Sequence, residues 1–211
     1  MSTTGHHHAH GPANRRRRVL RTAAPLFVRF PHGVARAAAV VLHDVPGLTG
    51  EIEDCCRALA RCGYVTAAPY LYYECGGREF RPDQGRTAMS RLTADDLAAD
   101  IGGALDHLRE RVGVPPSATA VLGVGMGGHL ATWAAAEHRL AAAVAHRPLG
   151  VDAAPWPGAP SLPQALARLR TPWLGLADAG DPLLAVTGDA VVPRELGWWD
   201  EAVRFIDARV N

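Results

Sequence analysis

A glycine-rich run, Gly123-Val124-Gly125-Met126-Gly127-Gly128, follows an apolar stretch and precedes a segment with helical spacing. Glycines permit a tight strand-to-helix turn because they lack a Cβ, and such a turn directs its central residue into a cleft. In enzymes with a nucleophile elbow this central residue attacks the substrate. Here it is Gly125, which has no side chain and cannot form an acyl-enzyme. We therefore expect no covalent catalysis from this position.

Polar side chains that could do acid–base chemistry follow three other apolar runs of the chain: His43, Asp44, His146 and Asp181. The carboxyl ends of parallel strands meet at one edge of a sheet, so these side chains could share one cleft. One interpretation makes His146 a displaced general base, held by Asp181 and acting on water. The interpretation that we favour makes both ordinary loop residues, because no spacing rule links them.

Strand-like and helix-like patterns alternate along the chain. Apolar runs typical of strands lie at 26–30, 37–42, 64–69, 118–122, 141–145 and 173–176. Helical spacing is found at 51–62, 93–111, 126–137, 164–170 and 198–208. This alternation predicts an α/β fold with helices on both faces of a mostly parallel sheet, a three-layer sandwich. The turn Pro31-His32-Gly33 joins the first two runs, which suggests a short hairpin feeding a buried strand.

The length and charge of the chain limit the classes of function. A chain of 211 residues suits one domain, which we place at 25–211 after a flexible, His- and Arg-rich tail at 1–24. The formal net charge of +1 gives no overall attraction to nucleic acid or to an anionic membrane. No run is long and apolar enough to span a bilayer. We assign no metal site to the tail histidines, because a mobile segment fixes no ligand geometry.

The four cysteines predict a reducing compartment. Cys55, Cys56, Cys62 and Cys75 lack the spacing of metal ligands, and the adjacent pair cannot easily form a disulfide. Reduced thiols in the cytoplasm are therefore expected. Cys75, in a loop that contains glycine, is the one thiol that could substitute for a missing nucleophile.

The order of several motifs resembles the dienelactone hydrolase family, whose elbow reads Gly-x-Cys-x-Gly-Gly. The resemblance extends across most of 26–207. It is carried, beside the elbow, by segments similar to the first cleft loop, a Gly-Tyr … Pro-x-Leu-Tyr strand, the helix before the elbow and the aspartate loop: 41–47, 61–72, 100–108 and 172–182. The resemblance implies an α/β-hydrolase-type fold and an ester or lactone hydrolase ancestry.

The catalytic triad of that family is incomplete in this sequence. Gly125 stands at the cysteine position, and Asp181 falls on the position of the aspartate. The family's histidine lies between the aspartate loop and the last helix, but 183–197 contains no histidine. Because a triad needs nucleophile, base and orienting acid in one hydrogen-bonded line, only the acid remains.

Binding groups of the family do carry over. Its oxyanion hole is built from backbone N–H groups that correspond to Met126 and Val45, and these donors do not depend on the missing side chains. Asp44 stands where the family has a glutamate that interacts with the resting thiol. The N-terminus of the helix after the elbow adds a partial positive charge.

Three functions are compatible with these residues. The first is a pseudo-hydrolase, a monomer or homodimer without cofactor or metal, that binds a small carboxylate or ester-like ligand through Val45, Met126, Asp44 and His43. The second is a weak ester or lactone hydrolase that uses relocated residues, namely Asp181, His146 or Cys75.

The third function belongs to another class of protein. Gly123-x-Gly125-x-x-Gly128 also fits a dinucleotide fingerprint, with Arg147 after the next strand, where it could meet a 2′-phosphate. That fingerprint normally opens a nucleotide-binding unit, whereas here about half of the chain precedes it. We therefore rank it behind the other two.

Overall fold

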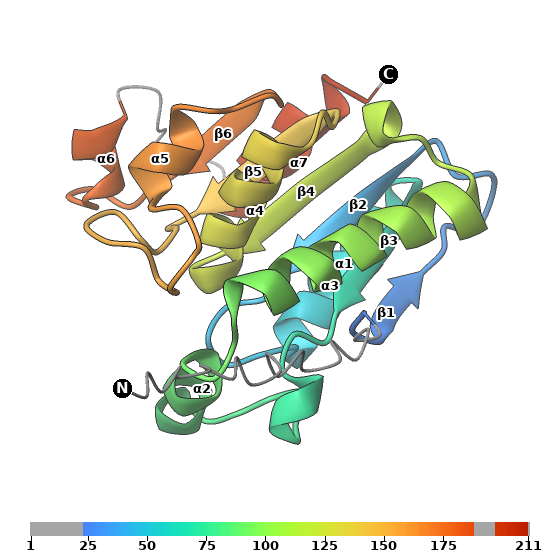
Figure 1. Ribbon diagram of the computed structural model, residues 1–211. Helices are drawn as coiled ribbons and strands as arrows, with labels where there is room; N and C mark the ends of the chain where they lie inside the picture. The colour runs from blue at the N-terminus through green and yellow to red at the C-terminus, as the bar shows by residue number, and fades with distance from the viewer. Residues whose placement is uncertain (1–22, 188–196, 211) are drawn as a thin grey trace, which may run out of the picture.

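The computed structural model describes residues 23–187 and 197–210. Figure 1 shows its strands and helices: β1 (Leu26–Arg29), β2 (Ala37–Leu42), α1 (Gly50–Arg61), β3 (Tyr64–Pro69), α2 (Pro82–Met89), α3 (Ala94–His107), β4 (Thr119–Val124), α4 (Met126–Glu137), β5 (Ala142–His146), α5 (Leu162–Leu166), β6 (Trp173–Leu176), α6 (Leu183–Val186) and α7 (Trp198–Asp207). Short 3₁₀-helices lie at Tyr73–Cys75 and Pro116–Ala118, and a π-helical turn lies at Leu108–Val112. None of the helices in these two ranges is long and apolar enough to cross a membrane.

One sheet of six strands runs through the described residues in the order β1-β3-β2-β4-β5-β6. All neighbouring strands are parallel except β1, which pairs antiparallel with β3. The predicted mostly parallel sheet is therefore confirmed. The predicted hairpin between the first two strands is wrong, because β3 lies between β1 and β2. The antiparallel register places Leu26 opposite Pro69.

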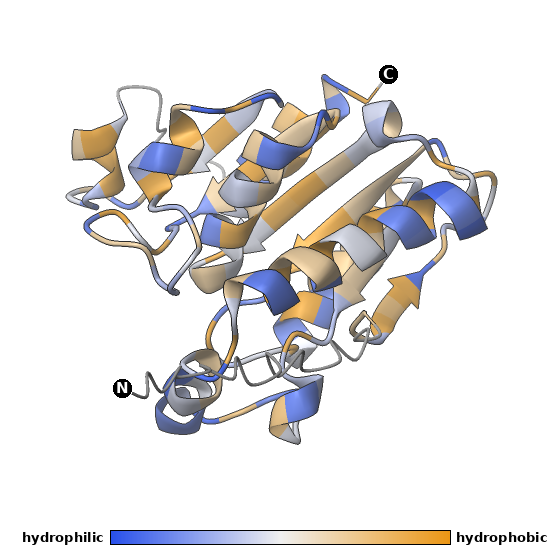
Figure 2. Cartoon of the chain, viewed as in Figure 1, coloured by the Kyte–Doolittle hydropathy of each residue, from blue (hydrophilic) through white to orange (hydrophobic). Residues whose placement is uncertain are grey.

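Helices cover both faces of the sheet, which confirms the three-layer α/β sandwich. On one face, α3 and α4 pack on the sheet and bury side chains such as Leu97 and Leu130. On the other face, α1 and α7 bury Leu59 and Ile206. Figure 2 shows hydrophobic residues along the middle of β4 and a mixture of hydrophilic and hydrophobic residues along α3. This pattern fits helices that lie half in the core and half in solvent.

Short elements and element ends differ most from the sequence-based expectation. The helix expected at 164–170 begins earlier, at Leu162, because Ser161 and Gln164 form a reciprocal capping box there. The α2 and α6 helices were not predicted, since each is too short to show a helical period. Thr93 caps α3, its side chain accepting a hydrogen bond from the Asp96 N–H.

The first described residues are already attached to the domain. The Ala24 N–H donates to the buried carboxylate of Asp100 on α3 at 2.8 Å, and Ala24 is itself buried. Ala24, expected to end the flexible tail, thus packs against α3. The remainder of the expected tail, 1–22, lies outside the described residues.

The strand register aligns the carboxyl ends of the central strands. Leu42 of β2 lies opposite Gly123 of β4, and His146 of β5 lies opposite both Val124 and Leu176. The segments that leave β2, β4, β5 and β6 therefore meet at one edge of the sheet. This edge is where the elbow and the candidate site residues are found.

The position of α4 over this edge depends on a backbone approach that only glycine allows. A Cβ on Gly127 would overlap the Leu42 carbonyl oxygen, whereas a Cβ on Gly102, in the middle of α3, would meet nothing within 4 Å. We expect Gly127→Ala to destabilise the protein by about 2–4 kcal/mol, since backbone must move. Gly102→Ala should instead stabilise it by roughly 0.5–1 kcal/mol through helix propensity. Urea unfolding of both variants checks this, and equal free energies of unfolding would contradict it.

Candidate functional site

The turn between β4 and α4 has the backbone of a nucleophile elbow. Gly125 adopts φ 54° and ψ −113°, a conformation that residues with a side chain rarely adopt. Its N–H donates to the His146 carbonyl at 2.8 Å, and its own carbonyl accepts from the His129 and Leu149 N–H groups at 3.2 and 3.1 Å. The elbow is thus fixed from three sides although it carries no side chain.

The carboxylate of Asp44 occupies the space where a side chain at position 125 would begin. A Cβ placed on Gly125 would overlap Asp44 Oδ1, and Oδ2 would lie 2.6 Å from it. Asp44 Oδ1 accepts a hydrogen bond from the Met126 N–H at 2.8 Å. Because Met126 begins α4, the partial positive charge of the helix N-terminus also stabilises this carboxylate. A backbone donor expected to serve a ligand is therefore used by the protein itself.

His43 is buried and supports the backbone of Asp44 from inside the protein. Its side chain is 1% exposed, and its Nδ1 lies 2.9 Å from the Asp44 carbonyl oxygen, to which it can only donate. Burial lowers the pKa of His43 to about 4, against the smaller raising effects of the Asp44 carbonyl and carboxylate. At neutral pH His43 is therefore an uncharged hydrogen-bond donor.

Tyr72, which the sequence pattern did not single out as a site residue, lies next to His43 and Met126. Its ring centroid is 5.0 Å from that of His43, and its hydroxyl donates to Met126 Sδ at 3.3 Å. Burial raises the pKa of Tyr72 well above its ordinary value, and the Asp44 charge adds to this. The signal available was its place in the Pro-x-Leu-Tyr segment, but the pattern did not reveal this packing role.

His146 is the last residue of β5 and stacks on an aromatic ring from α7. Its imidazole lies 4.5 Å from the Trp198 ring at an interplanar angle of 10°. Burial lowers the pKa of His146, opposed by the negative charges of Asp178, Asp181 and Asp44. Its Nδ1 is buried and has no hydrogen-bond partner among the described residues. At neutral pH His146 is thus uncharged and could accept a proton.

Asp181 does not orient His146 in this structure. Asp181 Oδ1 accepts the Leu183 N–H at 2.8 Å and so closes the first turn of α6. The nearby Asp178 pairs with Arg147 at 3.4 Å on the exposed surface. The structure therefore brings His146 and Asp181 into electrostatic range of each other without the hydrogen bond that a triad needs. The segment 188–196, where the family's histidine would fall, lies outside the described residues.

Cys75 lies against α2. Its Sγ lies 3.8 Å from the Ala88 carbonyl oxygen, and it lines a small cavity of about 250 Å³ together with Phe80 and Arg91. The other cysteines serve α1: Cys56 is buried in the core below β2, whereas Cys55 is half-buried and Cys62 is exposed. Of these three cysteines, only Cys56 is therefore fully buried.

The glycines of the elbow are explained by packing, without a dinucleotide. A Cβ on Gly123 would overlap the Gly127 carbonyl, and a Cβ on Gly128 would lie 3.0 Å from the His146 carbonyl oxygen. A pyrophosphate at the Met126 N–H would also meet the Asp44 carboxylate and be repelled by it. The described residues contain no group of three or more His, Cys, Asp or Glu side chains that could hold a metal ion.

The contact between Asp44 and Gly125 can be tested by a double-mutant cycle. We expect Gly125→Ala to destabilise the protein by about 2–4 kcal/mol, because strain at positive φ adds to the overlap with the carboxylate. In an Asp44→Gly background the same change should cost at least about 1 kcal/mol less. Gly76→Ala is the matched control, since Gly76 also has a positive φ of 84° but a Cβ added there would meet nothing within 4 Å. Additive effects of Gly125→Ala and Asp44→Gly in urea unfolding would refute the contact.

Burial of His43 should make stability depend on pH. Its pKa is about 4 in the folded protein and 6.5 when unperturbed, so the unfolded chain binds this proton first as the pH falls. The free energy of unfolding should therefore be full above pH 6.5 and fall by up to about 3 kcal/mol on the way to pH 4.

His43→Asn, which keeps an N–H donor but does not titrate, should show a flatter profile in urea unfolding at several pH values. His32→Asn, at an exposed position, is the control and should keep the wild-type slope. His129 and His146, whose pKa values burial also lowers, contribute a fall of the same sign in every variant. Identical slopes in the His43 variant and in the wild type would contradict the assignment.

Comparison with known proteins agrees with this geometry. The sequence of residues 26–187 matches the model of the Dienelactone hydrolase family. No protein of curated function matches the sequence. The fold is similar to a Klebsiella pneumoniae protein classed with the dienelactone hydrolases, at 21% identity and a TM-score of 0.66 over 88% of this chain and 74% of that one.

Two further solved structures share the fold. One, named m3DLH, is 27% identical, with a TM-score of 0.59 over 87% of this chain and 70% of that one. The other, esterase PE8, is 18% identical, with a TM-score of 0.59 over 89% and 98% of the two chains. Since the family match covers most of the chain, the protein described here belongs to the dienelactone hydrolase family.

Proposed function

We propose that this chain is a catalytically degenerate member of its family that binds a small ester-like or carboxylate ligand at the carboxyl ends of the strands. The observation that carries the proposal is the Asp44 carboxylate, which fills the place of a side chain at position 125 and accepts the Met126 N–H. A nucleophilic side chain cannot share that volume. The elbow is therefore better suited to binding than to acyl transfer.

The donors around Asp44 favour one protonation state of the ligand. The Val45 N–H, the second expected oxyanion donor, has no acceptor among the described residues, whereas the Met126 N–H is used by Asp44. A ligand carbonyl can accept from Val45, and a ligand N–H or O–H can donate to Asp44. A second carboxylate would be repelled by Asp44 unless the two groups share a proton. Esters, lactones and protonated acids should thus bind better than carboxylates at neutral pH.

A weak ester or lactone hydrolase is the second candidate, and the state of His146 favours it. A neutral imidazole near three carboxylates can accept a proton from water, and the negative charges stabilise the imidazolium. The hydroxide would add to the ester carbonyl, and the departing alkoxide would take a proton from His146. Without the covalent route such turnover is expected to be slow.

The oligomeric state, the compartment and the partners of the protein are also part of the proposal. We expect a monomer or homodimer that acts on a small molecule in the cytoplasm, without nucleic acid, membrane, metal or cofactor. The near-neutral formal charge supports the first two exclusions.

Hydrolysis and binding assays on the whole chain test the proposed function. We expect no hydrolysis of a dienelactone or of p-nitrophenyl esters above buffer, while a lactone raises the melting temperature more than its hydrolysed acid at pH 7. Asp44→Asn should reverse that preference, because the repelling charge is removed and the new side-chain amide can donate to the carboxylate of the acid. Asp178→Asn, at an exposed acid nearby, is the matched control and should not reverse it.

Two results would overturn the binding proposal. Turnover that disappears in His146→Ala, in Asp181→Ala or in Cys75→Ala would identify a hydrolase with a relocated catalytic group. The absence of any melting-temperature shift with lactone or acid, in the wild type and in Asp44→Asn alike, would exclude the cleft as a ligand site.

A further inference from the structure

A large groove lies on the helical face of the molecule between α3, α4 and α5. It has a volume of about 900 Å³, within the range of about 300–1,000 Å³ that is usual for small-molecule sites. Small residues create it, because the facing positions of α3 and α4 include Ala98, Gly102 and Ala134, which leave the space between the two helices unfilled. Pro160 and its neighbours, in the loop before α5, form one end.

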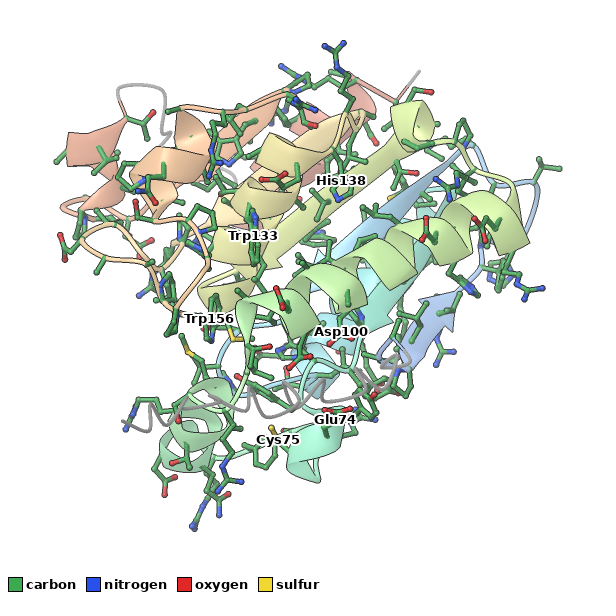
Figure 3. All side chains as sticks on the ribbon, in the orientation of Figure 1. Glu74, Cys75, Asp100, Trp133, His138 and Trp156 are labelled. Atoms are coloured by element: carbon green, nitrogen blue, oxygen red, sulfur yellow. The ribbon has the colours of Figure 1, made fainter. Side chains whose placement is uncertain are left out.

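This groove is separate from the cleft around Gly125. Its lining residues come from α3, α4, α5, the loop 158–160 and the residues directly after α4 and α5, and none of them is Asp44, His146 or Asp181. In Figure 3, Trp133 extends from α4 into the gap beside α3, and His138 lies farther along the same gap. The proposed function therefore does not account for this groove.

Trp133 gives the groove a flat apolar wall with one polar group to offer. Its side chain is half-buried, and its indole N–H donates no hydrogen bond to any described residue. The two comparable tryptophans are used differently: Trp156 donates to the Met89 carbonyl at 3.0 Å, and Trp173 donates to Thr132 Oγ1 at 3.1 Å. Trp133 thus lines the groove with its indole N–H still available to a ligand, whereas Trp156 and Trp173 are not among the lining residues.

A cation and an anion lie at the rim of this groove. Arg168 uses its Nε to donate to the Gln164 carbonyl at 3.2 Å, and no described carboxylate lies within ion-pair distance of its guanidinium. Glu137, at the end of α4, also has no ion-pair partner among the described residues, and exposed His138 follows it. Because a guanidinium offers several N–H donors in one plane, Arg168 is suited to a carboxylate or sulfonate.

We propose that the groove is a second binding site, for a small molecule with a flat apolar body and one anionic group. The body lies against Trp133 and Ile101, and the anion pairs with Arg168 on the side away from Glu137. The groove takes a neutral analogue less tightly, because the analogue gains the apolar contacts without the ion pair.

Two matched probes test this proposal on the whole chain. Anilinonaphthalene sulfonate has a flat apolar body and one anion, and N-phenylnaphthylamine has the same ring system without the sulfonate. Fluorescence titration should show one bound molecule of each per chain, with the anionic probe tighter. Arg168→Gln should weaken the anionic probe about fivefold and leave the neutral probe within about twofold.

Other variants separate the groove from nonspecific binding. Arg170→Gln removes the same charge two residues away, outside the groove lining, and should change neither probe. Glu137→Gln should tighten the anionic probe alone, since a like charge is removed. Ala98→Trp, at an exposed helix position, should fill the groove and weaken both probes at least about tenfold. Near-ultraviolet circular dichroism verifies that each variant is folded.

Several outcomes would overturn the proposal. Equal effects of Arg168→Gln and Arg170→Gln would show that the anion is not held at the groove. Wild-type affinity for both probes in folded Ala98→Trp would place them elsewhere. A dimer in light scattering that dissociates in Ala98→Trp would identify a second copy of the chain as the occupant. Asp44→Asn should leave both probes unchanged, so this test fails or succeeds independently of the proposed cleft function.

Discussion

The hydrogen bond from the Met126 N–H to the Asp44 carboxylate determines what the rest of the elbow can do. It joins the first residue of α4 to the loop after β2, across the edge of the sheet. The glycine at position 127 lets α4 approach the end of β2, and buried His43 holds the backbone of Asp44 by a second hydrogen bond. The helix N-terminus stabilises the negative charge that these contacts place there. The surrounding core thus positions a carboxylate where a side chain at position 125 would begin.

This arrangement explains why family membership and activity need not go together. The features that place the chain in its family are the sheet, the elbow backbone and the order of its motifs, and all of them are structural. The groups that break an ester bond are a few side chains at the tips of those elements. Here Gly125 removes one of them, and Asp181 is used as a cap for α6. Membership of the family therefore follows from the scaffold, and the function proposed above follows from those side chains.

Long, periodic segments of the sequence predicted the fold well. Contacts between segments that are distant in the chain could not be predicted from the sequence. The runs that became β2, β3 and β6 were located within a residue, because buried parallel strands are continuous apolar stretches. The partner of β1 was assigned wrongly, since adjacency in sequence favoured β2 and only the packed sheet selects β3. The short helices α2 and α6 were not detected, because neither shows a clear helical period in the sequence.

The site was predictable in the same uneven way. The glycine at the elbow and the loss of the nucleophile are visible in one motif, so Gly125 required no coordinates. The position of the Asp44 carboxylate could not be predicted without coordinates, because it depends on how closely the loop after β2 approaches the turn between β4 and α4. The same is true of the ring of Trp198, which lies more than fifty residues from His146 and yet covers it. Such contacts arise from tertiary packing, which leaves no local trace in sequence.

The fit between Gly125 and Asp44 has a consequence for the history of the protein. A change of Gly125 to cysteine would meet both backbone strain and the volume occupied by Asp44, and so would destabilise the fold. Loss of the Asp44 carboxylate first would free the Met126 N–H but supply no nucleophile, so it would bring no gain in hydrolysis. Each order of the two steps passes through a disadvantageous intermediate. On the function proposed above, the fit between Gly125 and Asp44 would therefore make a return to covalent hydrolysis at this elbow difficult in evolution.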